Sequence, residues 1–218
     1  MTPPARFCRL ARLYRWMEYL SFGPYLQRCR LLRLDECRSA RAVLVYGDGD
    51  GRFLARLAST AADAAILAVD CSVAMLAQTN RLLLPSAARV RLLCADARIF
   101  APAPEPEAGF DRVVTHFFLD CFSAEELRDI VTRATAAAAA GALWIVSDFA
   151  LPARAPMRQV ASIIIRCLYI AFGWLTGLRQ RRLPDHAAAL SAAGWQLDDR
   201  RELLRGLLIS ERWCRKTP

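Results

Sequence analysis

From residue 42 onward, short apolar runs alternate with longer stretches of helical spacing, and this alternation constrains the fold more than any other feature of the chain. Strands separated by helices of this length form βαβ units, in which a parallel sheet is buried between two layers of helices. The sequence therefore predicts an α/β fold of three layers with a mainly parallel sheet. The expected strands cover residues 42–46, 65–69, 90–94, 110–118 and 142–149, and the expected helices between them cover residues 52–59, 72–84 and 123–140.

The end of the chain follows a different pattern. Residues 195–204 and 207–214 are two strand-like runs, and they are joined near Arg205 and Gly206. Two runs with so short a connection favour a hairpin. We therefore expect the sheet to close with a C-terminal antiparallel hairpin.

The start of the chain is helical in pattern. Apolar residues recur at helical spacing from residue 7 to residue 34, with a break at Gly23 and Pro24. This favours an N-terminal helical cap at residues 1–41, followed by an α/β domain at residues 42–218.

Charge and cysteine content narrow the possible partners. The formal net charge is +9, but it comes almost entirely from arginine, since Lys216 is the only lysine, and no run of five or six basic residues occurs. Nucleic-acid binding is therefore disfavoured, although a high net charge alone would suggest it. The eight cysteines form no Cys-x-x-Cys pair and there are only two histidines, which argues against a structural zinc site. We expect no bound metal.

One segment is apolar enough to raise the question of a membrane. Residues 160–178 approach the length of a membrane span, which is about 20 residues. However, Arg166 lies inside the segment, and an arginine at a bilayer centre costs roughly 2.5–3.5 kcal/mol. We favour a helical insertion at residues 155–183 that covers a substrate, and peripheral membrane contact through residues 160–182 is the alternative. The first residues lack the apolar core of a signal peptide, so we expect a cytoplasmic protein that could be membrane-associated.

The turn after the first expected strand is rich in glycine. Gly47, Gly49 and Gly51 lie between this strand and a helix, where glycine permits positive φ and close approach of a ligand. A dinucleotide site with the pattern Gly-x-Gly-x-x-Gly would need its third glycine at position 52, which is arginine here. Asp48 also places a negative charge in the turn, which suits a cationic sulfonium better than a pyrophosphate.

Aspartates end the next two strands. Asp70 follows the second strand and could accept both hydroxyls of a ribose, and Asp96 follows the third, where it could receive an adenine amino group. Each aspartate alone is better explained as a helix cap. Three such strand ends in one chain are harder to explain without a ligand, because ligands of open α/β sheets bind outside the carboxyl ends of the strands.

These motifs resemble those of the class I, Rossmann-like methyltransferases that bind S-adenosylmethionine, and most closely the small-molecule enzymes similar to quinone-biosynthesis methyltransferases. The resemblance covers residues 40–150 and extends to the terminal hairpin. It implies that the cofactor is S-adenosylmethionine and that the following residues bind it: Tyr14, Gly47, Asp48, Gly49, Gly51, Asp70, Cys71, Met75, Asp96, Ala97 and Thr115. One departure is Val45, where the family often has an acidic residue that helps to hold the methionine amino group. Asp48 could compensate.

The end of the fourth strand faces the transferred methyl group in that family. His116 lies there and is the candidate catalytic base, since the pKa of histidine is normally near 6.5. Packing without a catalytic role is an equal alternative. Asp120 is the acidic residue that could orient His116, and Asp148, at the end of the fifth strand, is another candidate pocket residue.

The sequence offers fewer candidate residues for binding the methyl acceptor. Tyr169, Phe172 and Trp174 could form an apolar lid over a small lipophilic acceptor, to be methylated at oxygen or carbon. The basic cluster that follows is either a solvated turn or a patch for an acidic group; it consists of Arg179, Arg181, Arg182 and His186. Two other functions stay open: a cofactor-binding accessory protein without catalysis, and a nicotinamide-dependent oxidoreductase.

Overall fold

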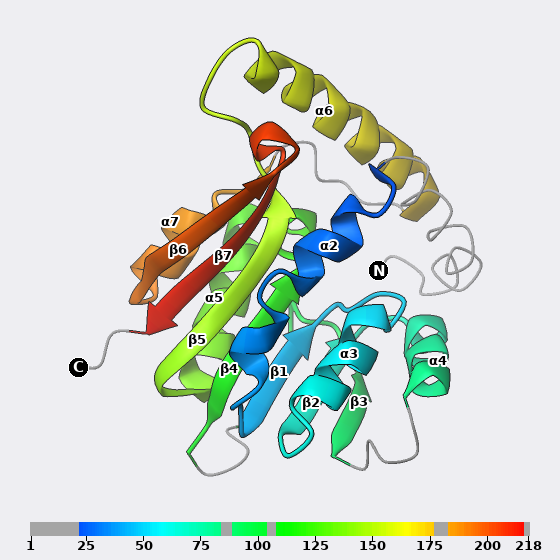
Figure 1. Cartoon of the computed structure of the whole chain (residues 1–218), viewed down its shortest axis with the longest axis vertical. Coiled ribbons are helices and arrows are strands. Elements are labelled where there is room, and N and C mark those ends of the chain that lie inside the picture. Colours follow the sequence, from blue (N-terminus) through cyan, green and yellow to red (C-terminus); the bar gives the residue numbers. More distant parts are fainter. Residues whose placement is uncertain (1–21, 84–88, 104–107, 177–182, 216–218) are drawn as a thin grey trace.

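The computed structural model describes residues 22–83, 89–103, 108–176 and 183–215, with the side chains of residues 171–176 left aside. Its centre is a seven-stranded sheet in the order β3-β2-β1-β4-β5-β7-β6 (Figure 1). Strands β1 to β5 are parallel, and β7 runs antiparallel to both β5 and β6. The predicted three-layer α/β fold with a mainly parallel sheet is therefore confirmed. The strands are β1 (Ala42–Tyr46), β2 (Ala65–Asp70), β3 (Val90–Cys94), β4 (Phe110–His116), β5 (Ala138–Phe149), β6 (Trp195–Leu203) and β7 (Leu208–Arg215).

Helices cover both faces of the sheet. On one face lie α2, the short helix η1, α3 and α4, and on the other lie α5 and α7, while α6 crosses beyond the end of β5 (Figure 1). The alternation along β1 explains the two layers: Val43 and Val45 pack against α3, whereas Leu44 and Tyr46 belong to the cluster that includes α5. The helices are α2 (Tyr25–Leu31), η1 (Leu34–Cys37), α3 (Arg52–Thr60), α4 (Val73–Leu82), η2 (Leu119–Cys121), α5 (Ala124–Ala137), α6 (Met157–Thr176), α7 (His186–Ala192) and η3 (Leu204–Gly206).

Local signals in the sequence place most helix starts correctly. Ser72 caps α4 by accepting a hydrogen bond from the Met75 amide. Ser123 and Glu126 form a capping box at the start of α5, as their spacing predicts.

Two strand boundaries differ from the prediction. Strand β5 begins at Ala138, within the alanine run that was expected to be helical, because Ala138 pairs with Phe110 of β4. Sheet pairing here overrides the high helix propensity of alanine. Strand β4 ends at His116 rather than at Phe118, because Phe117 takes a left-handed conformation with φ 50° and turns the chain away from the sheet.

The C-terminal hairpin is confirmed. Strands β6 and β7 pair over most of their length and are joined by η3, where Leu204, Arg205 and Gly206 all have positive φ. The hairpin contributes Trp213 to the hydrophobic core, where this buried residue pairs in register with Trp144 of β5.

Helix α6 lies over the tip of this hairpin. Ile165 and Tyr169 pack against Leu207, whereas Val160, Ile163 and Ile170 are exposed. In the described part of the chain, no helix has the length and apolarity that a membrane crossing requires. The side chains of Phe172 and Trp174 fall outside the description, as do the arginines at 179, 181 and 182.

Helix α7 corrects the expectation for His186, which was grouped with those arginines. His186 is the first residue of α7, and its Nε2 lies 2.9 Å from a carboxylate oxygen of the buried Glu211. The imidazole is therefore paired with an acidic side chain of β7 and is not part of a basic patch.

Candidate active site

The sheet order reverses between β1 and β4, and open α/β sheets bind ligands at this kind of switch point, beyond the carboxyl ends of the strands. The turn after β1 lies here. Its first residue is held in place because the Gly47 amide donates a hydrogen bond to the carbonyl of Val69, in β2.

The three glycines of the turn have positive φ and meet different surroundings. A Cβ on Gly47 would overlap the ring of Phe118, and a Cβ on Gly51 would stand 2.6 Å from the Thr79 Cα in α4. At Gly49 a Cβ would meet no described atom within 4 Å. Gly47 and Gly51 are therefore required by packing, whereas Gly49 leaves open space beside the turn.

Asp48 has a free oxygen inside the protein. Its side chain is 9% exposed, and one carboxylate oxygen accepts a hydrogen bond of 3.0 Å from the Leu54 amide in the first turn of α3. The other oxygen has no hydrogen-bond partner among the described residues. Burial raises the pKa of the Asp48 carboxyl to about 7, although the bond from Leu54 opposes this rise. An unpaired buried oxygen of this kind is costly unless a ligand donates to it.

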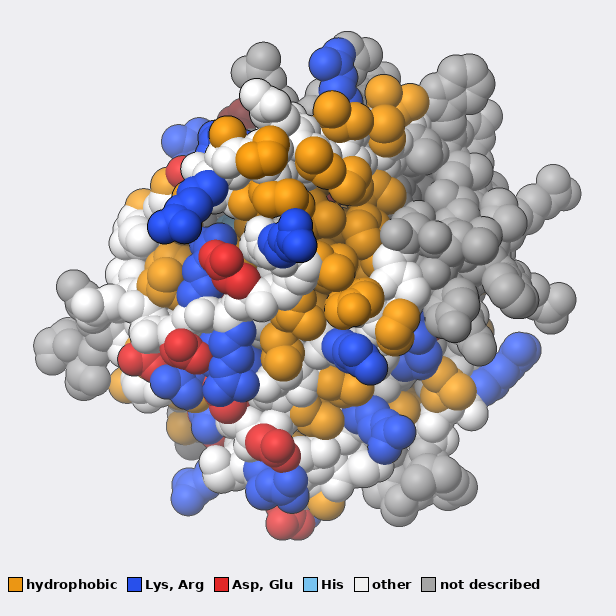
Figure 2. All heavy atoms as spheres, turned by 45° about the horizontal axis from the view of Figure 1, so that its top comes forward, with side chains coloured by type: hydrophobic (Ala, Val, Ile, Leu, Met, Phe, Trp, Pro, Cys, Tyr) orange, Lys and Arg blue, Asp and Glu red, His pale blue; other side chains and the backbone are white. Residues whose placement is uncertain are grey.

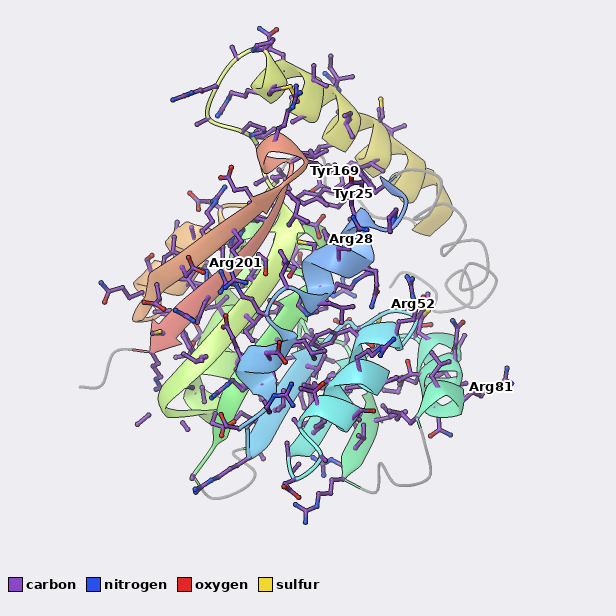
Figure 3. The ribbon with its side chains drawn as sticks, in the orientation of Figure 1. Tyr25, Arg28, Arg52, Arg81, Tyr169 and Arg201 are labelled. Carbon is purple, nitrogen blue, oxygen red and sulfur yellow. The ribbon has the colours of Figure 1, made fainter. Side chains whose placement is uncertain are left out.

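The second aspartate of the turn is already paired. Asp50 is 4% exposed, and its carboxylate accepts from the Arg52 guanidinium at the start of α3, the position labelled in Figure 3. The negative charge that remains available in the turn is therefore that of Asp48.

Asp70 lies beside the same turn. One of its oxygens accepts a bond of 2.8 Å from the Ser72 amide. Burial raises its pKa to about 6, while hydrogen bonds from the amides of Ser72 and Gly49 oppose the rise. Asp70 thus connects the end of β2 to the glycine turn. Met75 is buried in the first turn of α4, where its amide donates to the Ser72 hydroxyl, and Cys71 is exposed.

Asp96 is engaged differently from the expectation that it receives an adenine amino group. Both of its oxygens accept hydrogen bonds from the Arg98 guanidinium, which also lowers the pKa of the carboxyl. Its acceptor capacity is therefore largely used within the loop.

A residue that the sequence reasoning missed holds this loop in shape. The guanidinium of Arg133, in α5, donates to the carbonyls of Ala97, Arg98 and Phe100. Ala97 itself is 7% exposed. Nothing in the local pattern of α5 indicates this contact, because it links segments that are distant in sequence.

The end of β4 places Thr115 and His116 on opposite faces of the sheet. The Thr115 hydroxyl accepts a hydrogen bond of 3.0 Å from the Trp144 indole, so this side chain faces the core rather than a ligand. The prediction that it binds the cofactor is not supported. His116 is 3% exposed and meets Phe53 edge to face, with ring centroids 4.3 Å apart.

His116 is not oriented by Asp120, which corrects that expectation. Neither ring nitrogen of His116 has a hydrogen-bond partner among the described residues, and Asp120 instead contacts Cys121 and Tyr169. Burial lowers the pKa of His116 well below its ordinary value, and the charge of Arg30 lowers it further. These surroundings favour packing over the role of a base.

Arg30 is a second missed residue. It is 5% exposed in α2, its guanidinium lies over the Phe117 ring at 5.1 Å from the centroid, and its charge also lowers the pKa of Asp48. Phe117 has φ 50°, a strained conformation for a bulky residue. Backbone strain of this kind concentrates at functional sites, so it is consistent with a functional site at the end of β4. Tyr14, which was expected to close the site, lies outside the described residues.

Comparisons with known proteins agree with this geometry. Residues 43–141 match the family model of a methyltransferase domain. No curated protein sequence matches the chain significantly.

Several solved structures share the fold. An O-methyltransferase family protein from Burkholderia thailandensis has a TM-score of 0.66 at 16% identity, over 95% of this chain and 57% of that one. The S-adenosylmethionine-dependent methyltransferase SibL, solved in its apo form, has a TM-score of 0.68 at 19% identity, over 93% and 57%. The N-methyltransferase NodS from Bradyrhizobium japonicum WM9, in complex with S-adenosyl-L-homocysteine, has a TM-score of 0.58 at 14% identity, over 87% and 86%.

This chain spans 57% of the length of the first two of these proteins. None of the three is named as a quinone-biosynthesis enzyme, so closeness to that group stays a prediction. The matched residues 43–141 include the glycine turn, Asp70, Asp96 and the end of β4. Residues 43–141 are therefore similar to a methyltransferase domain, and the chain has the fold of the class I methyltransferases.

Proposed function

We propose that this protein transfers a methyl group from S-adenosylmethionine to a small, lipophilic acceptor at oxygen or carbon. The observation that carries the proposal is the buried Asp48 oxygen without a described partner, which lies in the glycine turn at the switch point of the sheet. A carboxylate at this place suits a ligand with a cationic amino group and a sulfonium. Asp48 would also take the place of the acidic residue that the family often has at the position of Val45.

The residues around the turn fit the other parts of such a ligand. Gly49 leaves room for close approach, and the Asp70 carboxylate, held by the amides of Ser72 and Gly49, is placed to accept from ribose hydroxyls. Met75 supplies an apolar surface for an adenine ring. When bound, the cofactor supplies an electrophilic methyl group.

The protein's own contribution is to bind, orient and exclude water. Methyl transfer is an in-line displacement, so holding the acceptor in line with the methyl group supplies much of the acceleration. We propose that residues 1–41 close over the cofactor and that α6 covers the acceptor. Arg30 supports the first part, because α2 places it beside Asp48 and His116.

The acceptor class is supported by the surroundings of the strand ends. Phe22, Phe117 and Phe149 form a continuous group of rings between α2 and the end of β5, with centroid distances of 5.4 and 5.2 Å. Apolar and aromatic surfaces of this kind favour a lipophilic acceptor. The comparison proteins include enzymes named for methylation of oxygen and of nitrogen, so their names do not select the atom.

Two alternatives make different predictions. A nicotinamide-dependent oxidoreductase is disfavoured, because the unpaired Asp48 carboxylate would face the pyrophosphate. A cofactor-binding accessory protein without catalysis would bind S-adenosylhomocysteine and show no transfer.

The test is calorimetric titration of the protein with S-adenosylhomocysteine and, separately, with NADH. We expect micromolar binding of the first only, weakened at least tenfold by Asp70→Ala. Asp63→Ala is the matched control, since Asp63 is exposed just before the opposite end of the same strand. Binding of NADH alone would overturn the proposal, and so would equal affinities of the two aspartate variants.

We also propose that α6 contacts an anionic lipid surface. Its exposed apolar residues Val160, Ile163 and Ile170 lie near the exposed Arg158 and Arg166, and hydrophobic side chains gather on the corresponding face of the molecule (Figure 2). Such a combination is typical of peripheral attachment. Co-sedimentation with vesicles containing phosphatidylserine should weaken in Ile163→Asp and persist in Leu197→Asp, an exposed apolar position in β6. Equal sedimentation of both variants would exclude the contact.

A further inference from the structure

Two buried carboxyl groups lie together on the acceptor side of the site. Asp120 is 6% exposed in η2, just after β4, and Asp148 is 1% exposed at the end of β5. The two strands are neighbours in the sheet, so their carboxyl ends bring these side chains to the same edge. Sequence reasoning assigned Asp120 to His116 and left Asp148 without a partner.

The contacts of the pair are specific. The Tyr169 hydroxyl, reaching from α6 toward the sheet (Figure 3), lies 3.3 Å from the Asp120 carbonyl oxygen and 3.5 Å from a carboxylate oxygen. The Cys121 thiol donates to the other carboxylate oxygen at 3.5 Å. One oxygen of Asp148 accepts from its neighbour's amide, at Phe149, and the other has no hydrogen-bond partner among the described residues. A carboxylate oxygen that is buried and unpaired calls for a ligand or a proton.

Burial and mutual repulsion divide the ionisation between the two groups. Burial raises the pKa of Asp120 to about 6, while the bonds from Cys121 and Tyr169 oppose this rise. Burial raises the pKa of Asp148 well above its ordinary value, and the charge of Asp120 raises it further. Asp148 therefore holds a proton more readily than Asp120, the division of roles expected when two carboxyls share one site.

Other titratable groups face the pair from every side. They are Cys29 of α2, Cys121 of η2, Tyr169 of α6, His186 of α7 and Glu211 of β7. Burial raises the pKa of each of the thiols and of the Tyr169 phenol, so these stay neutral near pH 7. Glu211 is already paired with His186 and Arg200. Asp120 is the carboxylate of this group whose ionised form is stabilised by hydrogen bonds from Cys121 and Tyr169.

Resting on the methyl transfer proposed above, we propose that Asp120 is the catalytic base that accepts the proton of an acidic hydroxyl on the acceptor, a phenol or an enol. Asp148 and Tyr169 are positioning residues. In the step, the acceptor oxygen forms a bond to the methyl carbon and the carbon–sulfur bond breaks. The electron pair of that bond stays on sulfur, which leaves as the neutral thioether of S-adenosylhomocysteine, and the hydroxyl proton passes to the Asp120 carboxylate.

The chemistry of the base selects the acceptor class. A phenol has a pKa of about 10, as in tyrosine, so a carboxylate whose pKa is raised toward neutral can share its proton as the new bond forms. The rings of Phe117 and Phe149, which flank the pair in sequence, also suit an aromatic acceptor. His116 does not compete for this role, because its ring is buried against Phe53.

The experiment separates this inference from the proposed function in two stages. Calorimetry with S-adenosylhomocysteine first establishes cofactor binding, and its failure would defeat the methyltransferase proposal itself. Proteins that bind are then assayed with S-adenosylmethionine carrying a labelled methyl group and a panel of simple phenols and catechols. The variants are Asp120→Asn, Asp148→Asn and Tyr169→Phe. The control is Asp111→Asn, which lies at the opposite end of β4, where its carboxylate accepts from the amides of Arg41 and Ala42.

We expect Asp120→Asn to lower the rate about 100-fold or more, the usual contribution of a general base, with cofactor affinity retained. The wild-type rate should fall below about pH 6, as Asp120 takes up a proton. Asp148→Asn, which mimics the protonated group, should keep this profile. Tyr169→Phe should move the inflection to higher pH, because it removes a hydrogen bond that stabilises the ionised Asp120. A purely structural role for Tyr169 would leave the inflection in place.

A measurement without acceptor guards against variants that fold poorly. Infrared spectra of the wild type at pH 7 should contain absorption of protonated carboxyls, to which Asp48 also contributes. This absorption should decrease in Asp148→Asn and stay unchanged in Asp111→Asn. The inference is overturned by an unchanged rate in Asp120→Asn, by unchanged absorption in Asp148→Asn, or by a protein that binds S-adenosylhomocysteine yet methylates no member of the panel.

Discussion

The backbone of Gly51 lies against Thr79, so that a Cβ on this glycine would stand 2.6 Å from the Thr79 Cα and 2.6 Å from its hydroxyl oxygen. The contact joins the start of α3 to α4. It shows that the last glycine of the turn is needed for helix packing, whereas Gly49 borders open space. The two positions are otherwise alike, since both have positive φ.

We therefore expect Gly51→Ala to affect mainly stability and Gly49→Ala to affect mainly ligand binding. Gly51→Ala should lower the free energy of unfolding by more than the roughly 1–3 kcal/mol of left-handed strain, because it adds a collision with backbone. Gly49→Ala should cost only the strain but weaken S-adenosylhomocysteine binding. Gly194→Ala, also strained and open but distant from the site, controls for strain alone. Urea unfolding and calorimetry measure the two effects, and identical behaviour of Gly49→Ala and Gly194→Ala would contradict the assignment.

Asp48→Asn should stabilise the unliganded protein while weakening cofactor binding. The pKa of Asp48 is raised from 3.8 to about 7 on folding, so its contribution to stability is present below about pH 4 and is lost as pH rises through 7. The neutral side chain of the variant avoids this loss. The free energy of unfolding of Asp48→Asn should therefore exceed that of the wild type by a margin that grows between pH 5 and pH 8, up to a few kcal/mol at about 1.4 kcal/mol per pKa unit.

Asp96→Asn should instead lower stability by a similar amount at pH 5 and pH 8, because the Arg98 ion pair lowers the pKa of Asp96 and the stability from this pair is lost only as pH falls below about 4. Urea unfolding at both pH values compares the two variants. A constant difference between Asp48→Asn and the wild type would contradict the ionisation argument.

His116→Phe should leave catalysis nearly unchanged. The ring is buried beside Phe53, and burial lowers its pKa well below 6.5, so the wild type loses stability when the unfolded chain takes up a proton at low pH. The variant should be at least as stable at pH 5 and should methylate the phenol panel within a few-fold of the wild-type rate. His186→Phe, which breaks the pair with Glu211, is the destabilised comparison. A large loss of turnover in His116→Phe would restore the role of base to this histidine.

Arg33→Ala should be among the most destabilising changes. The guanidinium is 1% exposed and donates to Glu36, to Asp199 and to the Ser210 carbonyl, joining the segment after α2 to the C-terminal hairpin. Removing it takes away a buried side chain and leaves the buried Ser210 carbonyl without this donor, at a cost on the order of 3 kcal/mol. Arg38→Ala removes an exposed pair with Asp35 and should change stability by less than about 1 kcal/mol. Similar unfolding midpoints for the two variants would contradict this account.

The expectations that succeeded depend on neighbouring residues. Apolar periodicity separated strands from helices, Ser123 with Glu126 placed the start of α5, and the spacing of the glycines located the turn. These signals are local, because a strand's alternation, a capping box and a positive φ are each decided within a few residues.

Where tertiary contacts competed with local preference, the expectations failed. The run at Ala138 has high helix propensity but pairs as a strand with Phe110, and Phe117 ends β4 early in a conformation that no local pattern favours. Alternation along a strand places successive side chains on opposite faces, but it did not tell which residues they contact there. Thr115 faces Trp144, and His116 faces Phe53.

The sequence by itself determined the class of fold, the position of the glycine turn and the strand ends that lie at the switch point of the sheet. Only the tertiary structure decided which charges are buried together: Arg30 beside Asp48, Arg133 on the loop at Ala97, and Asp120 with Asp148 beneath Tyr169. The physical reason is that a group's ionisation and reactivity depend on burial and on partners brought from distant segments.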